Sequence, residues 1–233
     1  QLTECRRSSI EQVKLTAKCF YEPEGDEPIE PVERDSSLEH NLPLAINTSI
    51  LFFDICSHYK SETDGEKNKS SLNKVSAALI PEILEQLNKY EKVKDYSVGV
   101  ITGYTAQFRE IKKHLNRKIQ RSGLKNIRNW NKQEEKLTVS VVDRFQGLER
   151  DIVIVDLVKS GAGLNLGFLE VPNRINVALS RQKKLLIIVG DYYGIVNAKT
   201  KRTNGKKAAL QHYLEAIKSD WIVKAEQVKE VFK

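Results

Sequence analysis

The sequence of 233 residues contains no methionine, and its three cysteines and four histidines are scattered along the chain. No CxxC pair and no cysteine–histidine spacing typical of a zinc site occurs, so we expect neither a metal site nor a disulfide framework. Sparse, unpaired cysteine favours a reducing, intracellular location, cytoplasmic or, in a eukaryote, nuclear. Because no initiating methionine is present, we expect a piece of a longer protein.

Long apolar runs are missing as well. No stretch approaches the roughly 18 apolar residues that a membrane-spanning helix needs. The start of the chain, QLTECRRSSIEQ, is too polar for a secretory signal. We therefore expect no membrane partner.

The chain also lacks the common nucleotide-binding loops. No GxxxxGKS or GxxxxGKT sequence occurs, so the backbone amides and the lysine that hold the β- and γ-phosphates of a nucleotide are not supplied here. No GxGxxG follows an apolar run, so a dinucleotide site is not indicated. By itself, the chain should not hydrolyse nucleotide.

Positive charge is what the chain does have, with 38 Lys and Arg against 31 Asp and Glu and a net charge of +7. A basic balance suits an anionic partner, most commonly nucleic acid. Two basic stretches, 112–136 with Trp130 and 199–207, fit the binding of a single strand. A solvated surface is the more ordinary interpretation of each stretch.

Apolar periodicity predicts the fold. Nearly continuous runs of Val, Ile and Leu predict strands at 49–56, 96–102, 136–143, 151–158 and 184–191. Helical patterns lie at 10–20, 106–115, 172–181 and 206–221. A further helix should begin near Ser71, and Pro81 should kink it or break it early. This alternation predicts an α/β fold, a mostly parallel sheet with helices on both faces.

The segment DRFQGLERD, 143–151, places charged and amide side chains on one short connection between two apolar strands. Ligands of parallel sheets bind beyond the carboxyl ends of the strands. The loops after Thr102, Asp143 and Val158 should therefore share one edge of the sheet. A satisfied polar turn is the alternative interpretation.

Three segments together resemble the second RecA-like domain of superfamily 1 helicases, in the group that includes the nonsense-mediated-decay helicase. They are ITGYTAQFREIKKHL (101–115), VSVVDRFQGLERDIVIVDLV (139–158) and FLEVPNRINVALSRQKKLLIIVGD (168–191), which resemble motifs IV, V and VI. Motif IV usually has proline where this chain has Gly103. LTECRRSSI (2–10) resembles the arginine-bearing segment that follows motif III, with Cys5 and Arg6 where the family often has Gln and Tyr.

The resemblance implies that Arg181 of motif VI is an arginine finger and that Arg7, or its neighbour Arg6, is a second contact to the γ-phosphate of ATP. A planar guanidinium offers two aligned donors to the charge that develops during phosphoryl transfer. Arg181 could instead serve the dipole of the helix that it ends, and Arg7 could be a solvated terminal residue.

The resemblance also implies nucleotide contacts for Gln146, Gly147 and Glu149 of motif V, with Glu149 accepting from a ribose hydroxyl or orienting Arg181. Arg174, two helical turns before Arg181, should face roughly the same way and contact phosphate or a neighbouring domain. Gln107 could hydrogen-bond across the cleft. A surface salt bridge for Arg174 and core or surface packing for Gln107 remain open.

The nucleic-acid side of the site is expected to comprise Thr102, Gly103 and Tyr104 of motif IV, with Asp143 and Arg144 of motif V. Backbone amides, hydroxyls and aromatic rings are common contacts to single-stranded DNA or RNA. Tyr104 could equally fill core or surface space.

We predict three parts: an arginine-bearing entry segment with an extended connection (1–47), the second RecA-like domain (48–195) and a C-terminal helical extension (196–233). The implied function is the C-terminal motor domain of an ATP-dependent helicase, an ATP hydrolase. ATP and Mg²⁺ would be held mainly by an N-terminal RecA-like domain of the same protein. A non-catalytic RecA-like module that binds nucleic acid or protein, and a translocase without unwinding, remain alternatives.

Overall fold

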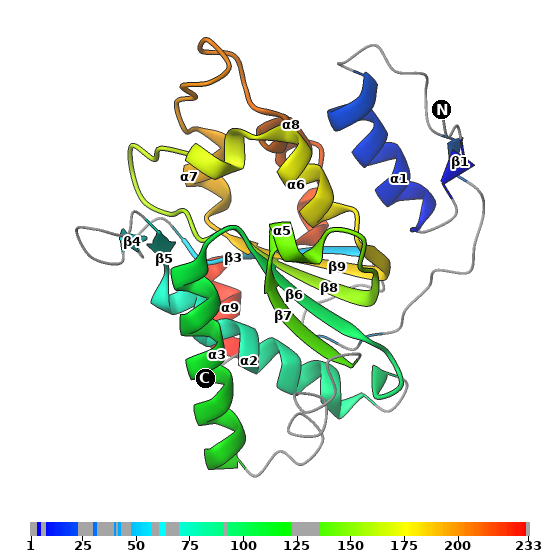
Figure 1. Ribbon diagram of the computed structural model, residues 1–233, viewed down its shortest axis with the longest axis vertical. Coiled ribbons are helices and arrows are strands. Elements are labelled where there is room, and N and C mark those ends of the chain that lie inside the picture. Colours follow the sequence, from blue (N-terminus) through cyan, green and yellow to red (C-terminus); the bar gives the residue numbers. More distant parts are fainter. Residues whose placement is uncertain are drawn as a thin grey trace.

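A computed structural model describes residues 4–5, 8–22, 30–31, 40, 42, 48–56, 61–63, 70–90, 93–122 and 136–231. At its centre lies a six-stranded sheet whose strands are all parallel, in the order β10, β3, β9, β8, β6, β7. Helices cover both faces of this sheet (Figure 1). The predicted α/β, RecA-like architecture is confirmed.

The strands follow the apolar runs of the sequence. Those of the main sheet are β3 Ile50–Asp54, β6 Val98–Thr102, β7 Leu137–Val141, β8 Arg150–Asp156, β9 Gln182–Gly190 and β10 Ile222–Val223. Two short pairs lie outside it, β1 Glu4–Cys5 with β2 Glu30–Pro31 and β4 Glu62–Thr63 with β5 Ser71–Leu72. The strand predicted at 136–143 ends at Val141, because the next residues coil into a helical turn.

The helices divide between the two faces of the sheet. One face carries α2 Lys74–Lys89, α3 Thr105–Ser122 and α9 Ala225–Val231. The other carries α1 Ile10–Thr16 with the π-helical turn Ala17–Tyr21, α5 Val142–Phe145, α6 Pro172–Leu179, α7 Tyr192–Val196 and α8 Ala209–Glu215. Single turns of 3-10 helix, η4 Gly167–Glu170 and η5 Ser219–Trp221, complete this layer.

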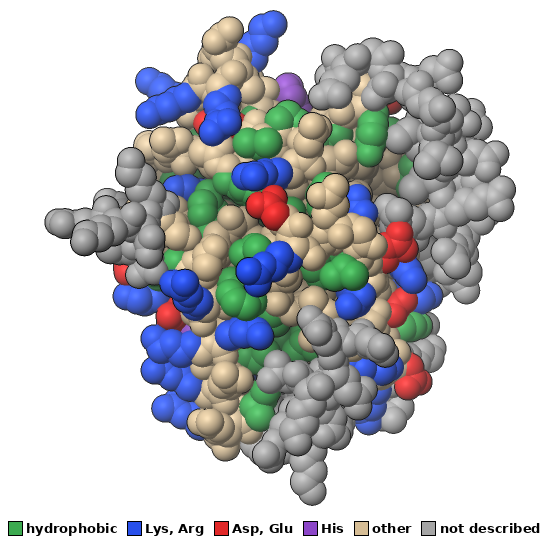
Figure 2. Space-filling view, in the orientation of Figure 1, with side chains coloured by type: hydrophobic (Ala, Val, Ile, Leu, Met, Phe, Trp, Pro, Cys, Tyr) green, Lys and Arg blue, Asp and Glu red, His purple; other side chains and the backbone are tan. Residues whose placement is uncertain are grey.

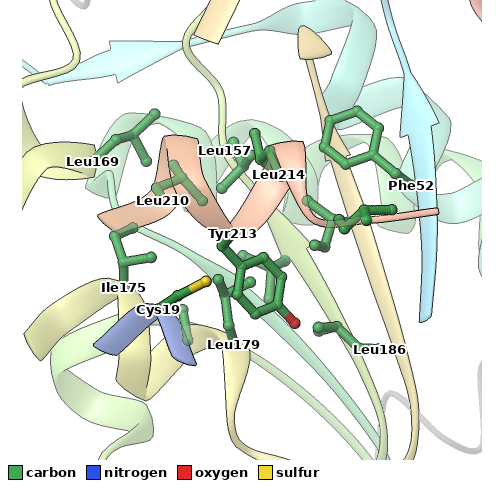
Figure 3. Packing of buried hydrophobic residues seen from close by; sticks show 14 of the residues in the cluster. Cys19, Phe52, Leu157, Leu169, Ile175, Leu179, Leu186, Leu210, Tyr213 and Leu214 are labelled. Carbon is green, nitrogen blue, oxygen red and sulfur yellow. The ribbon is translucent and has the colours of Figure 1, made fainter. Parts of the chain in front are cut away.

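Every strand of the main sheet except β7 contributes alternate side chains to two apolar cores, as a strand buried on both faces must. In β3, Leu51 and Phe53 join the core under α2 and α3, whereas Ile50 and Phe52 join the core under α6 and α8. Figure 3 shows the second core, in which Tyr213 of α8 points toward Leu186 of β9. These two layers fix the sheet edges on which the candidate site is built.

Helix α2 differs from its sequence prediction at both its start and its proline. Asn73, not Ser71, caps it: the Asn73 side-chain oxygen accepts from the amides of Val75 (3.0 Å) and Ser76 (3.1 Å). The predicted early break at Pro81 does not occur, and the helix runs to Lys89. Burial on the sheet outweighs the local cost of proline, roughly 3 kcal/mol, because an entire apolar face of α2 is buried.

The segment after 195 is less helical than predicted. The helix predicted at 206–221 is confined to α8 and the η5 turn, and β10 then adds a strand to the main sheet beside β3. Among the described residues, no helix combines the length and apolar character needed to cross a membrane.

Candidate functional site

The polar connection between β7 and β8 joins the two opposite edges of the sheet, which we call the carboxyl rim and the amino rim after the strand ends found there. β6 lies between β7 and β8, so α5 must cross over it. Gly99 of β6 permits this crossing, because a Cβ added there would lie 2.5 Å from Cζ of the fully buried Phe145. The polar connection within motif V therefore begins at the carboxyl rim, after β7, and reaches the amino rim, where β8 starts.

Arg181 lies at the amino rim, between α6 and β9. Its carbonyl accepts a hydrogen bond from the amide of Arg150 (3.1 Å), the first residue of β8, and this places Arg181 next to Glu149, which immediately precedes that strand. The Arg181 side chain is partly exposed, and its Nε donates to the Val177 carbonyl (3.1 Å). The guanidinium thus covers the last turn of α6, where a helix dipole favours a cation. The finger candidate and Glu149 share one rim.

Motif V is anchored at this rim by Arg150, a residue that the sequence did not single out. Its guanidinium donates to the Thr138 hydroxyl (2.7 Å) and the Glu149 carbonyl (2.8 Å). The preceding turn, with Gln146 and Gly147, is exposed. Gly147 has a φ of +85°, a left-handed backbone conformation that glycine adopts without strain. The Arg150 contacts fix the path by which the turn reaches Glu149.

Ser8 brings the start of the chain to the amino rim as well. Its hydroxyl donates to the carbonyl of Gln182 (2.7 Å), the residue that follows Arg181. Arg6 and Arg7 lie outside the described residues, as does 123–135 of the basic stretch with Trp130, so the predictions made on them stay predictions.

A second set of predicted residues meets at the carboxyl rim. The Tyr104 ring packs edge-on to Phe168, with centroids 5.8 Å apart, and the ammonium of Lys159 lies 5.5 Å from the Tyr104 ring. Gly103 lies beneath the same phenyl ring, because an added Cβ would come within 2.5 Å of Phe168. The glycine that replaces the usual motif IV proline therefore makes room for Phe168.

Arg174 belongs to this carboxyl-rim set and not to the surroundings of Arg181. Its guanidinium lies 5.8 Å from the Phe168 ring, and its Nε is 3.3 Å from a carboxylate oxygen of Asp143. Both partners of this ion pair are more than half exposed, so the pair contributes little stability. The two arginines flank α6 at opposite ends, about 10 Å apart along its axis. Arg144 is exposed near Asp143 on α5.

Two of the predicted ligand contacts are buried. Thr102 is 1% exposed, and its hydroxyl has no hydrogen-bond partner among the described residues. Gln107 is fully buried: its amide nitrogen donates to the Ser76 hydroxyl (2.9 Å) and to Asp156, and its oxygen accepts from the Asn73 amide (2.7 Å). In this arrangement Gln107 ties α2 and α3 to β8, which is the packing role that the sequence left open.

Aspartates end three neighbouring strands at the carboxyl rim and cap the chain that follows. Asp54 accepts from the amides of Cys56 and Tyr192, Asp156 from that of Val158, and Asp191 from those of Gly161 and Gly194. Burial raises the pKa of Asp156 to about 6 and raises the pKa of Asp54. An apolar strand followed by aspartate, repeated at three strand ends, is a sequence signal from which such caps can be predicted.

Burial also lowers the pKa of Lys159, because the low-dielectric surroundings disfavour its charge. Within the described part of the chain, no group of three or more His, Cys, Asp or Glu side chains is placed to hold a metal ion. The candidate site thus has two parts, the residues predicted to contact nucleotide at the amino rim and a basic, aromatic set at the carboxyl rim, and motif V joins them.

Comparison with known proteins decides the family, since residues 1–193 match the family described as "AAA domain". The chain belongs to that family. It is 36% identical over 140 residues to "Regulator of nonsense transcripts 1" of Caenorhabditis elegans, covering 60% of this chain and 12% of that protein. It is 30% identical over 176 residues to "Helicase sen1" of Schizosaccharomyces pombe, covering 75% and 10%. These relatives and motifs IV to VI identify it as a second RecA-like domain of the superfamily 1 helicases.

This AAA domain also matches "DNA polymerase alpha-associated DNA helicase A" of Saccharomyces cerevisiae, at 32% identity over 122 residues, 52% of this chain and 16% of that protein. A solved structure, the C-terminal domain of a possible DNA helicase from Lactobacillus, aligns with a TM-score of 0.44 at 13% identity and covers 95% of this chain and 99% of that chain. The chain spans 10–16% of the length of the three sequence relatives.

Proposed function

We propose that this chain is the C-terminal motor domain of an ATP-dependent nucleic-acid helicase. ATP and Mg²⁺ are bound mainly by an N-terminal RecA-like domain of the same protein, and the amino rim of this chain closes over the γ-phosphate. The single observation that carries the proposal is the meeting of Arg181 and Glu149 at one rim, fixed by the 3.1 Å hydrogen bond between Arg150 and Arg181.

Arg181 stabilises the negative charge that develops on the transferring phosphoryl group. In the conformation observed, its Nε rests on the Val177 carbonyl, and closing of the ATP-bearing domain exchanges this contact for the γ-phosphate oxygens. A charge-assisted, bidentate contact is stronger than a neutral hydrogen bond to a carbonyl, so the exchange favours the closed form. Glu149, held by Arg150, is positioned to accept from the ribose or to orient Arg181.

The carboxyl rim supplies part of the groove for a single strand. Tyr104 and Phe168 provide aromatic surface, and Lys159 and Arg174 provide positive charge beside it. Motif V links this surface to the amino rim through α5, so opening and closing of the nucleotide cleft can move the strand-binding residues. This connection gives the physical basis for stepping along a strand.

The test is strand-stimulated ATP turnover of the full-length protein with Arg181→Ala. We expect turnover to fall by a factor of about 10³–10⁵, the usual effect of an arginine finger. Lys89→Ala, which removes an exposed cation at the end of α2 outside the candidate site, is the control and should turn over as the wild type does. Wild-type turnover in Arg181→Ala would remove the enzymatic role and favour a RecA-like module that only binds nucleic acid.

A further inference from the structure

The carboxyl rim carries a row of aromatic and basic side chains that follows the strand order. β6, β8 and β9 are adjacent, and their ends are in register at Thr102, Asp156 and Val189. Tyr104 follows β6, Lys159 follows β8, and Tyr193 follows β9 in the first turn of α7. Because neighbouring strands lie about 4.8 Å apart, these three positions are spaced along one line at the sheet edge.

Tyr193, at the far end of this row, has an exposed side chain that a ligand can reach. It is 70% exposed, although the other aromatic residue of the turn, Tyr192, packs edge-on against Phe52 of β3. Asn197 lies one helical turn after Tyr193, on the same side of α7. Asn197 also lines a cavity of about 500 Å³ with Lys199, Lys206 and Lys207 among its other walls. An exposed aromatic residue thus lies one helical turn from a residue that lines a basic cavity.

The basic walls belong to the 199–207 loop, KTKRTNGKK, which contains five Lys or Arg and no acidic residue. Figure 2 shows basic side chains gathered over this end of the molecule, at the top of the view. The loop is held in place from the sheet side. Glu170, 3% exposed, accepts from the backbone amides of Lys201 (2.9 Å) and Arg202 (2.6 Å). Since these bonds use backbone groups, the exposed side chains of Lys201 and Arg202 point their charge outward.

Glu170 also links the loop to the strand-facing surface already described. It ends the η4 turn that carries Phe168, the ring packed against Gly103 and Tyr104. The same rim has little outward negative charge. The carboxylates of Asp54, Asp156 and Asp191 accept from backbone amides. The surface that runs from Tyr104 to the 199–207 loop is therefore mainly aromatic and basic, and its acidic side chains Asp143 and Glu215 are ion-paired with Arg174 and Lys207.

We propose that a single strand of DNA or RNA continues past the motif IV surface, crosses Lys159, and ends on Tyr193 and the 199–207 loop. This inference rests on the proposed function and extends its strand-binding site beyond motifs IV and V. Tyr193 stacks a base, and Lys201, Arg202 and Lys206 neutralise the adjacent phosphates. A basic groove with aromatic platforms is the arrangement by which proteins bind single strands without sequence preference.

Affinity measurements on the full-length protein without nucleotide test this path, with labelled oligothymidylates of roughly 6 to 16 nucleotides and fluorescence anisotropy as readout. Tyr193→Ala should weaken binding of the long oligonucleotides by about 5- to 100-fold, the usual cost of losing one base stack. Tyr193→Phe, which keeps the ring, should bind as the wild type does. The shortest oligonucleotides, which reach only the Tyr104 surface, should be bound equally by all three proteins.

Salt dependence tests the phosphate contacts separately. Lys201→Ala/Arg202→Ala should reduce the slope of log affinity against log salt by about 1.4, since each phosphate contact to a single strand contributes about 0.7. Lys89→Ala, which removes an exposed cation at the end of α2, should leave the slope unchanged. Unchanged affinity in Tyr193→Ala together with an unchanged slope in the loop variant would overturn the extended path.

That failure would leave the proposed function standing, because Arg181→Ala tests it through ATP turnover. Arg181→Ala should bind the long oligonucleotides with wild-type affinity and salt slope. If the wild type bound no oligonucleotide of any length, the strand-binding part of the proposed function would be lost together with this inference.

Discussion

Two glycines of motif IV and its strand offer a matched pair of substitutions whose outcomes should differ. In Gly99→Ala and in Gly103→Ala, the new Cβ meets an aromatic carbon at the same distance, 2.5 Å. At Gly99 the ring is that of Phe145, which is 0% exposed beneath the α5 crossing. At Gly103 the ring is that of Phe168, which is partly exposed and can rotate away from the surface. The burial of the contacted ring, and not the distance of the initial clash, should therefore decide how much stability each substitution removes.

For Gly99→Ala, we expect the chain to be destabilised by about 1–2 kcal/mol. Overpacking of a filled core costs about 1–3 kcal/mol, and removing a strand glycine returns roughly 0.5–1 kcal/mol of backbone entropy. For Gly103→Ala, Phe168 swings out at little cost, and the entropic gain leaves stability near that of the wild type. In a domain of this size, about 1–2 kcal/mol corresponds to a difference in Tm of roughly 2–8 °C.

The assay is urea or thermal unfolding of the chain followed by far-ultraviolet circular dichroism. Gly103→Ala should show its effect in another measurement, because displaced Phe168 no longer supports Tyr104, and affinity for a single strand should fall. Equal loss of stability in the two variants would refute the reasoning, since it would mean that the α5 crossing is no more tightly packed than the exposed rim.

Two further predictions concern buried polar groups. Burial raises the pKa of Asp156 from 3.8 to about 6, so the folded state binds more protons than the unfolded state between these two pH values. The free energy of unfolding of the wild type, relative to that of Asp156→Asn, should therefore fall by up to about 3 kcal/mol as pH rises through this window and should stay level above it. Urea midpoints that run parallel for the two proteins from pH 4 to 8 would contradict this linkage. Asn73→Ala removes the cap of α2 and should lower the free energy of unfolding by about 1–2 kcal/mol. Asn73→Ser keeps a capping oxygen and should retain most of that stability. Similar losses of stability in the two variants would argue against the cap.

The sequence alone was sufficient for the five longer strands of the main sheet and for the family, but not for the short strand β10. Runs such as Ile152–Val158 are apolar on both faces, and only a parallel sheet covered by helices buries both, so period and composition predicted the architecture. Motifs IV to VI carried the resemblance because phosphate and strand contacts need particular residue types at particular spacings. These are local properties of the chain, and they can be recognised without knowledge of the tertiary contacts.

Tertiary contacts decided what the individual side chains do. Pro81 stays inside a helix because the sheet buries α2, and Gln107 is inside the protein because Asn73 and Asp156 meet it from other elements. Arg174 and Arg181 look equivalent on a helical wheel, yet Asp143 and Phe168 hold one at the carboxyl rim while the Arg150 amide holds the other region at the amino rim. Strand order, which no local pattern encodes, placed Tyr104, Lys159 and Tyr193 in one row, because residues far apart in the chain become neighbours only when the sheet assembles.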